Sequence, residues 1–434
     1  MTPLVGRMLD TLDERVALRR PARHLANKVF PSHWSFLLGE VALFSFMILV
    51  ATGVFLTMFY RPSTAPVVYT GTSAIYAGRE LPEVFASIVR LSHDVDGGLL
   101  FRRIHRASSH VFIGACIAHL LRVVLTGAFR RPRELNYLIG LTLLLLAVGS
   151  GYSGHNLPYD VLAGTSLRIL YTLLLSVPYL GEPLALGAFG GEFPGDIMPR
   201  LFVVHVLALP GLIAGLMTVH LLILGRQTHT QLPRTGIDGA QRVVGEPLWP
   251  WQAARSTGLA LGLGATVALS AALVPWSDVD LHGPFEIAQT TNTAQPDWFL
   301  FWVEGVLRIY PPIEFHVAGT VVSGPLVGGV LLPLALVALG YAYPFLERRR
   351  HPEPGDHHVA QHPLQIPFRA GAVAGVVVLL VLLTLAGGND VIARLLGLST
   401  ESVLWAFRIA VPLAPPLAAW GAAAHARAQG RRWT

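Results

Sequence analysis

Cysteine is almost absent from this 434-residue chain, and its absence excludes several kinds of centre. The one cysteine, Cys116, has no second thiol with which to form an internal disulfide. An iron–sulfur cluster needs several thiolates, so the chain cannot hold a cysteine-ligated cluster, and no CxxCH motif is present for covalent haem. Centres of these kinds must belong to a partner subunit.

Charged side chains are also scarce, because Asp, Glu, Lys and Arg make up only 13% of the residues. Soluble domains carry about 25%, whereas 53% of this chain is hydrophobic. Eight segments are apolar over close to the ~20 residues that a helix needs to cross a bilayer. They are residues 36–59, 99–125, 138–154, 201–224, 256–273, 321–343, 370–385 and 403–424. The predicted fold is an all-α, polytopic membrane protein with eight transmembrane helices.

Basic residues gather in the N-terminal segment and in alternate loops, and the positive-inside rule places them on the cytoplasmic side. An even number of spans then puts both termini there as well. The net charge of +6 reflects these arginines beside a membrane surface and does not indicate nucleic-acid binding. They are Arg7, Arg15, Arg19, Arg20, Arg23 and Lys28, then Arg130, Arg131 and Arg133, then Arg226, Arg234 and Arg242, then Arg348, Arg349 and Arg350.

Four histidines lie in two of the predicted spans, His105 and His119 in the second and His205 and His220 in the fourth. At about 1.5 Å and 100° per residue, gaps of 14 and 15 residues place each pair about 21 to 22 Å apart on one helix face. Matching by depth pairs His105 with His205 near the outer side and His119 with His220 further inward. Such pairs suit two stacked, bis-histidine haems, which carry electrons because no axial position is left for oxygen.

A single histidine of this kind is better explained as a satisfied polar residue at a helix interface or as part of a proton path, but four histidines at matched spacing favour haem. Glycines favour the haem interpretation, because flat cofactors need small residues on the flanking helices. Gly39 and Gly53 lie 14 residues apart in the first span, and Gly140 and Gly154 lie 14 apart in the third. Such glycines also serve as ordinary packing devices between membrane helices.

Two arginines lie three residues from histidines on the second span, Arg102 before His105 and Arg122 after His119. Both are candidates to meet haem propionates. The alternative is that they extend their charged ends to the membrane interface.

Four motifs carry a family resemblance. Residues 102–140 (RRIHRASSHVFIGACIAHLLRVVLTGAFRRPRELNYLIG) and 154–160 (GHNLPYD) resemble the plastid and Gram-positive branch of cytochrome b, from cytochrome bc complexes. Residues 225–236 (GRQTHTQLPRTG), with the following RVVGEP, resemble actinobacterial members that use menaquinol. Residues 296–311 (PDWFLFWVEGVLRIYP) resemble the PEWY motif beside the outer quinol oxidation site. The resemblance runs from about residue 32 to residue 424.

The resemblance implies that the four histidines ligate two non-covalent b-type haems, and that Pro296, Asp297, Trp298 and Phe299 border the site of quinol oxidation. Asp297, where many relatives have glutamate, would accept a quinol proton, and quinol would bind near Asp297 and Tyr310. His229 would lie beside the quinone reduction site. From the residues alone, residues 296–311 could also form an amphipathic surface helix that begins at Pro296 and Asp297. His229 could also be a solvent-exposed histidine in a loop.

Several positions depart from the family pattern, and they fall near the outer quinol pocket. Tyr159 replaces a tryptophan, His155 replaces a tyrosine, and Phe299 replaces the tyrosine of PEWY. Leu37 stands near the position where plastid-type members attach a third haem through cysteine. Two haems are therefore expected.

The implied function is an enzyme subunit of a quinol–cytochrome c oxidoreductase, a translocase of the bacterial cytoplasmic membrane. A Rieske-type iron–sulfur protein and a c-type cytochrome are the implied partners, in a homodimeric complex. The actinobacterial branch adds a haem–copper oxidase as a possible partner in a supercomplex. The expected organisation is a cytoplasmic interfacial helix (1–31), a haem-binding four-helix half (32–233), a cytoplasmic linker (234–255) and a subunit-four-like half (256–434) with the quinol-site loop. The first 30 residues lack an apolar core followed by a cleavage site, so no secretory signal is expected.

Two other functions compete with this one. A haem-bearing membrane anchor of a dehydrogenase also passes electrons between quinone and haem, but such anchors have fewer spans and lack an outer loop like that of residues 296–311. A haem-free transporter would suit eight spans rich in glycine and proline, such as Pro210. It predicts no haem absorption and gives no reason for the matched glycine spacing.

Overall fold

The computed structural model describes residues 10–11, 13–17, 19–233, 243–276, 278–288, 295–317 and 320–430. Three of the predicted cytoplasmic arginines, Arg7, Arg234 and Arg242, lie outside the described residues. So do residues 1–9 of the predicted interfacial helix and residues 234–242 of the predicted linker.

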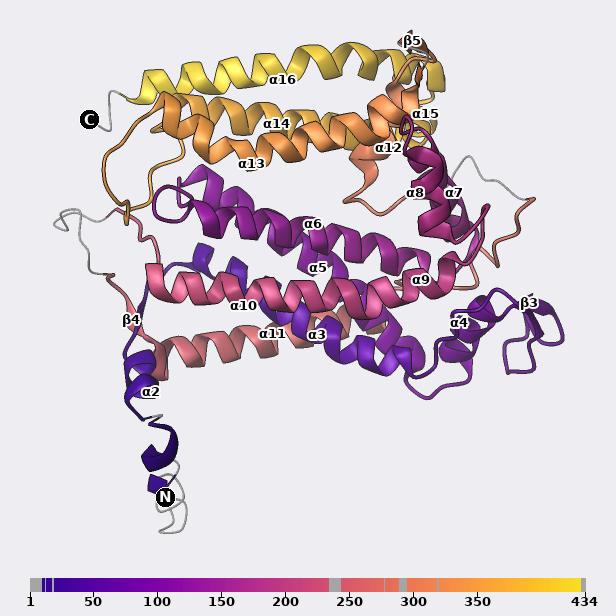
Figure 1. Ribbon diagram of the computed structural model, residues 1–434, viewed down its shortest axis with the longest axis horizontal. Coiled ribbons are helices and arrows are strands. Elements are labelled where there is room, and N and C mark those ends of the chain that lie inside the picture. Colours follow the sequence, from indigo (N-terminus) through magenta and orange to yellow (C-terminus); the bar gives the residue numbers. More distant parts are fainter. Residues whose placement is uncertain are drawn as a thin grey trace.

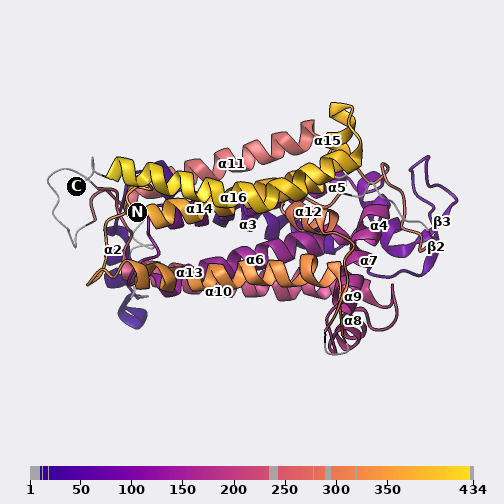
Figure 2. The ribbon, with the colours of Figure 1, turned by 90° about the horizontal axis from the view of Figure 1, so that it is seen from above.

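Eight helical segments within the described residues are long and apolar enough to cross a membrane, as predicted. They run side by side along the long axis of the molecule, and both chain ends lie at one end of the bundle (Figures 1 and 2). Their main helices are α3 (Leu38–Thr57), α5 (Gly98–Leu125), α6 (Glu134–Asn156), α10 (Leu209–Gln227), α11 (Ala253–Leu273), α13 (Leu332–Arg350), α14 (Pro367–Gly387) and α16 (Thr400–Gly430). The last of these tolerates three prolines, Pro412, Pro415 and Pro416.

The fourth span is built from three pieces, α9 (Ile197–Val203), the π-helical turn η2 (Val204–Ala208) and α10. The fifth span begins with the irregular turn η3 (Leu248–Gln252), and the sixth begins with η4 (Pro325–Leu331). The predicted start of the sixth span at residue 321 is wrong, because β6 (Thr320–Val322) pairs with β5 (Phe315–Val317) in a hairpin. Hydropathy alone does not separate the valines of this hairpin from those of the helix that follows.

Four helices, α3, α5, α6 and α10, form a bundle. Within it α3 packs along α5, α10 packs along α6, and α5 contacts α6. The helix α11 lies against α5 and α3, whereas α14 packs on α16 and also touches α5. These helices are apolar nearly all round, as expected for segments that face lipid on one side and protein on the other.

Shorter elements cover the end opposite the chain termini (Figure 2). They are α4 (Glu83–His93), α7 (Val161–Leu175), α8 (Gly181–Phe189), α12 (Phe301–Ile309), α15 (Asn389–Leu396) and the paired strands β2 (Pro66–Val68) and β3 (Glu80–Pro82). At the terminal end, α2 (Arg19–Ala26) precedes β1 (Val29–Phe30), which pairs with β4 (Glu246–Pro247). The all-α prediction is confirmed apart from these short strand pairs. Each pair forms by backbone hydrogen bonding between segments of two or three residues, which are too short to show a strand pattern in the sequence.

A layer of apolar side chains fills the middle of the four-helix bundle. It includes Phe46, Phe112, Ile113 and Ile213, all of them at most 9% exposed. Each of these residues falls midway between the two histidine or glycine positions of its own helix. The layer therefore separates two levels of the bundle, one toward each end.

Candidate functional site

At the end of the bundle that carries α4 and α12, which is the predicted outer side, two predicted ligands lie face to face. His105 of α5 and His205 of η2 lie with ring centroids 6.3 Å apart and ring planes at 72°. Two metal–nitrogen bonds of about 2 Å each, plus about 1.1 Å from each nitrogen to its ring centre, span about 6 Å. The separation therefore suits one metal ion bound between the two imidazoles. His205 lies in a π-helical turn, a feature that often marks functional sites.

Hydroxyl groups from neighbouring helices fix the orientation of both outer imidazoles. Thr52 Oγ1 lies 2.9 Å from His105 Nδ1, and Ser153 Oγ lies 3.0 Å from His205 Nδ1. Such partners hold a ligand's ring and its tautomer. Sequence analysis missed both residues, although each is a polar residue in an apolar helix directly before a glycine of the predicted spacing.

Each of the four predicted glycines lies against a different one of the four histidines. A Cβ atom added to Gly53 would lie 3.4 Å from His105 Cε1, and one added to Gly154 would lie 2.5 Å from His205 Cε1. At the other level, a Cβ added to Gly39 would lie 3.3 Å from His119 Cε1, and one added to Gly140 would lie 3.5 Å from His220 Cε1. The glycines thus leave room for the imidazole rings at both depths.

The inner level contains a cavity of about 290 Å³ lined by His119 and His220. The guanidinium of Arg122 also lines this cavity, and its carbon lies 4.1 Å from the centre of the Phe36 ring. The Nε and Nη2 atoms of Arg122 are buried and have no hydrogen-bond partner in the described part of the chain. An anionic group reaching into the cavity would satisfy them, since unpaired buried donors are costly.

The same cavity reaches His229, whose ring packs 4.8 Å from that of Phe30. Burial, together with the positive charges of Lys28, Arg133 and Arg122, lowers the pKa of His229 to about 4. The imidazole is therefore neutral at physiological pH. This placement argues against the alternative of a freely solvated loop histidine.

The outer loop that carries the PDWF motif folds back onto the bundle. Asp297 is 8% exposed and forms an ion pair with Arg106 of α5, whose Nη1 donates to Asp297 Oδ2 at 2.8 Å. His155, at the end of α6, places its Nδ1 3.4 Å from the same carboxylate oxygen. Sequence analysis did not single out Arg106. A charged residue inside a predicted membrane span, directly after a predicted ligand histidine, could have indicated it as a site residue.

The other motif residues take different positions. Trp298 is 43% exposed and its Nε1 donates to His110 Nδ1 at 3.0 Å. Phe299 joins the apolar middle layer, with its ring against Gly151. Pro296 is partly buried beside Asp297.

Two predicted residues lie slightly apart from these contacts. Tyr310, directly after α12, packs its ring against Gly324. Arg102 is buried near the outer end of α5, where its Nη1 donates to Ser92 Oγ at 3.0 Å. Of the two predicted propionate partners, only Arg122 lies in the described cavity.

Known proteins resemble this chain over most of its length. A family model described as Cytochrome b(N-terminal)/b6/petB matches residues 110–284. A cytochrome bc1 complex cytochrome b subunit from Streptomyces coelicolor is 38% identical over 419 residues, covering 96% of this chain and 76% of the relative. The subunit of the same description from Mycobacterium bovis is 39% identical over 415 residues, covering 95% and 75%. The chain belongs to the cytochrome b family.

A chain of a solved structure described as "Hyperthermophilic respiratory Complex III" is similar in fold to this one, with a TM-score of 0.66 and 20% sequence identity. That match covers 96% of this chain and 100% of the other. Because the fold extends over nearly the whole chain, the C-terminal helices belong to it as well as the four-helix bundle.

Membership of the cytochrome b family implies haem b, and the residues present fit such a group. Paired imidazoles, glycines against each ring and the unpaired donors of Arg122 are the features that a propionate-bearing, bis-histidine haem needs. When bound, haem b would supply reversible one-electron chemistry.

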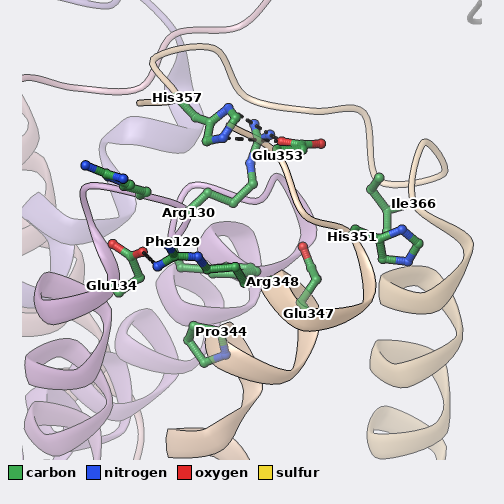
Figure 3. A pocket seen from close by; sticks show the side chains of 11 residues that line it. Phe129, Arg130, Glu134, Pro344, Glu347, Arg348, His351, Glu353, His357 and Ile366 are labelled. Atoms are coloured by element: carbon green, nitrogen blue, oxygen red, sulfur yellow. Dashed lines mark hydrogen bonds and ion pairs between the residues drawn. The ribbon is translucent and has the colours of Figure 1, made fainter. Parts of the chain in front are cut away.

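A second, much smaller pocket of about 30 Å³ lies at the terminal end of this cytochrome b, beside the inner cavity. Figure 3 shows it between the loop after α5 and the end of α13, with Glu347 and Glu353 among its lining residues. Phe129 lines both spaces. Behind the pocket, Glu347 pairs with the fully buried Arg369, which links α13 to α14.

Exchanging single glycines tests the fit at each level. Gly154→Ala would put a methyl group 2.5 Å from His205 Cε1, and an imidazole fixed by a metal bond cannot move aside. We expect this variant to lose or shift the absorption of a haem bound at this level. Gly140→Ala is the matched control, because 3.5 Å is an ordinary contact. Reduced-minus-oxidised spectra of both variants measure the difference, and equal spectra would contradict the packing described.

Proposed function

We propose that the chain is the di-haem cytochrome b subunit of a respiratory quinol–cytochrome c oxidoreductase, a translocase. The observation that carries this proposal is the arrangement of four histidines at two levels, each facing its own glycine. His105 and His205 would hold the outer b-type haem, and His119 and His220 the inner one. An apolar layer between the levels suits electron transfer across the low-dielectric centre of a membrane.

The outer loop supplies the proposed site of quinol oxidation. Pro296, Trp298 and Phe299 would shape the pocket, with Asp297 and Tyr310 near the quinol hydroxyls. The side chain of Asp297 is held in place by Arg106 and lies at the same end of α5 as His105. The family resemblance favours menaquinol as the substrate.

The inner cavity supplies the proposed site of quinone reduction. His229 lines the same space as His119 and His220, and its neutral imidazole can hydrogen-bond to a quinone oxygen. Proton uptake at this side and release at the other would store energy, because moving one charge across 100 mV involves about 2.3 kcal/mol.

Partners and location follow from the same proposal. A Rieske-type iron–sulfur protein and a c-type cytochrome would receive one electron of each quinol in a dimeric complex. A haem–copper oxidase is a further candidate partner. Both termini would face the cytoplasm of a bacterium, and the haem-binding half would be followed by a linker at 234–255 and by the subunit-four-like half.

A spectroscopic experiment tests this function. The purified complex is expected to show two b-type haems in its reduced-minus-oxidised spectrum, and menaquinol is expected to reduce both. Reduction through the outer site should depend on an oxidised iron–sulfur partner, so depleting that partner should slow it. A chain without b-type absorption would contradict the proposal and favour a haem-free transporter.

A further inference from the structure

A carboxylate in the first turn of α3 lines the inner cavity. It belongs to Glu40, which directly follows Gly39, the glycine that lies against His119. Glu40 Oε1 accepts a hydrogen bond from Gln252 Nε2 at 2.8 Å, and Oε2 accepts one from Ser256 Oγ at 2.7 Å. Gln252 lines the same cavity. Ionisable residues inside membrane spans are rare and often belong to proton relays.

A site that reduces a quinone to a quinol must supply protons as well as electrons, and most ionisable residues of the cavity cannot do so. His229 is neutral at physiological pH, so it can hydrogen-bond to a quinone but holds no surplus proton. His119 and His220 would be occupied by the proposed inner haem. Arg122 and Arg133 line the cavity as well, but a guanidinium group does not release its proton in proteins.

Two other titratable side chains line the described part of the cavity, and each is engaged elsewhere. The hydroxyl group of Tyr137 donates to the backbone oxygen of Gly340 at 3.0 Å. Cys116 packs against the apolar middle layer, whose side chains cannot pass a proton to it. Among the lining residues that the structure describes, Glu40 is therefore the one that can hold a proton and release it.

The surroundings of the Glu40 carboxyl group suit both of its protonation states. Its two hydrogen-bond partners are neutral side chains, whereas the carboxylate of Asp297 is paired with an arginine. A serine hydroxyl can donate to a carboxylate, and after rotation it can accept from a carboxylic acid. The oxygen that faces Gln252 accepts a hydrogen bond in either state. Glu40 can therefore gain and lose a proton without leaving these partners unsatisfied.

We propose that Glu40 delivers protons to a quinone bound in the inner cavity, and that Gln252 and Ser256 position its carboxyl group. The inference rests on the proposed function and deepens it by naming the proton donor of the quinone reduction site. In the step, the O–H bond of the carboxyl group breaks and an O–H bond forms on a quinone oxygen, while the electrons arrive from the proposed inner haem. Water at the end of the bundle that holds the chain termini then returns a proton to the carboxylate.

The test uses the purified complex with its iron–sulfur partner depleted, so that menaquinol reduces haem through the inner cavity. The step then runs in reverse, and the carboxylate of Glu40 takes the proton of the quinol. Glu40→Gln keeps the size of the side chain and an oxygen that accepts hydrogen bonds, but it cannot take a proton. We expect the maximal rate of haem reduction to fall by about 10² or more, the usual contribution of a general acid or base. The half-saturating menaquinol concentration should change little, because the variant loses proton transfer and not binding.

Two further variants show whether the loss is specific to proton transfer. Glu40→Asp keeps an ionisable carboxyl group and should recover part of the rate that Glu40→Gln loses. Glu134→Gln is the matched control and should react at the normal rate. Glu134 also lies in the first turn of a membrane helix, where an acidic side chain favours the helix N-terminus, but it lines the second, smaller pocket.

The outcomes separate this inference from the proposed function. If the unchanged complex shows no b-type absorption, or if menaquinol does not reduce it, the proposed function itself is refuted. If Glu40→Gln reduces haem at the normal maximal rate, Glu40 is not the proton donor. A rise in the half-saturating concentration alone would assign Glu40 to quinone binding, and loss of haem absorption would assign it to the fold. Either result, or a Glu40→Asp variant no faster than Glu40→Gln, would overturn the inference.

Discussion

Replacing His205 by leucine is expected to remove the proposed outer haem and to reduce quinol–cytochrome c activity to background. The imidazole lies opposite His105 at a ring separation of 6.3 Å, and no other histidine side chain contacts His105 in the described part of the chain. Leucine cannot bind iron, so the proposed outer haem would lose one of the two residues that would hold it. Without that haem, the second electron of the proposed quinol reaction would have no acceptor.

The measurement is the reduced-minus-oxidised spectrum together with the haem content per chain. His205→Leu should lose the outer component, whereas His119→Leu should lose the inner one. His110→Leu is the matched control for haem content, because His110 lies on α5 between the two ligands but contacts Trp276 and Trp298. Full haem content in either ligand variant would refute the assignment.

Replacing Arg369 by methionine is expected to destabilise the fold by about 3–5 kcal/mol, because it leaves a buried charge without its partner. Arg369 is 0% exposed and Glu347 is 3% exposed. Arg369 Nε donates to Glu347 Oε2 at 3.1 Å, and Tyr343 OH donates to the same oxygen at 2.6 Å. The guanidinium also packs 5.5 Å from the centre of the Phe129 ring.

The double variant Arg369→Met, Glu347→Leu should recover most of that loss, since a buried ion pair replaced by apolar groups is often neutral. Arg348→Met is the matched control beside the same pocket (Figure 3). Arg348 is 60% exposed and lies 3.7 Å from Glu134, so its removal should cost less than about 1 kcal/mol. Thermal unfolding in detergent measures all three. Equal midpoints for Arg369→Met and Arg348→Met would contradict the structural role of the buried pair.

The membrane fold was predictable because hydrophobicity and helix length act locally. All eight spans follow from composition and agree with the structure, with errors mainly at their ends. The sixth span shows the reason for such an error, since Val321 and Val322 are as apolar as the helix but belong to a hairpin. Backbone pairing between neighbouring segments decided that boundary.

The residues of the candidate site could be predicted where their relative positions depend on a single helix. The 14-residue gap from His105 to His119 fixes both depth and face, and Gly39 and Gly53 follow the same rule on their own helix. By contrast, Arg106 and Asp297 are 191 residues apart, and no periodicity connects them. The orienting hydroxyls of Thr52 and Ser153 were likewise missed, because their partners lie on other helices.

The amino-acid sequence by itself determined the number of membrane crossings, the positions of the four histidines at two depths and the glycines at matching spacing. These features depend on the rise and rotation per residue of a single helix, which are set by interactions between residues close together in the chain. The tertiary structure decided that the outer loop turns inward, that its carboxylate binds an arginine, and that His155 faces both. Those contacts depend on how separate segments pack, which adjacent residues do not specify.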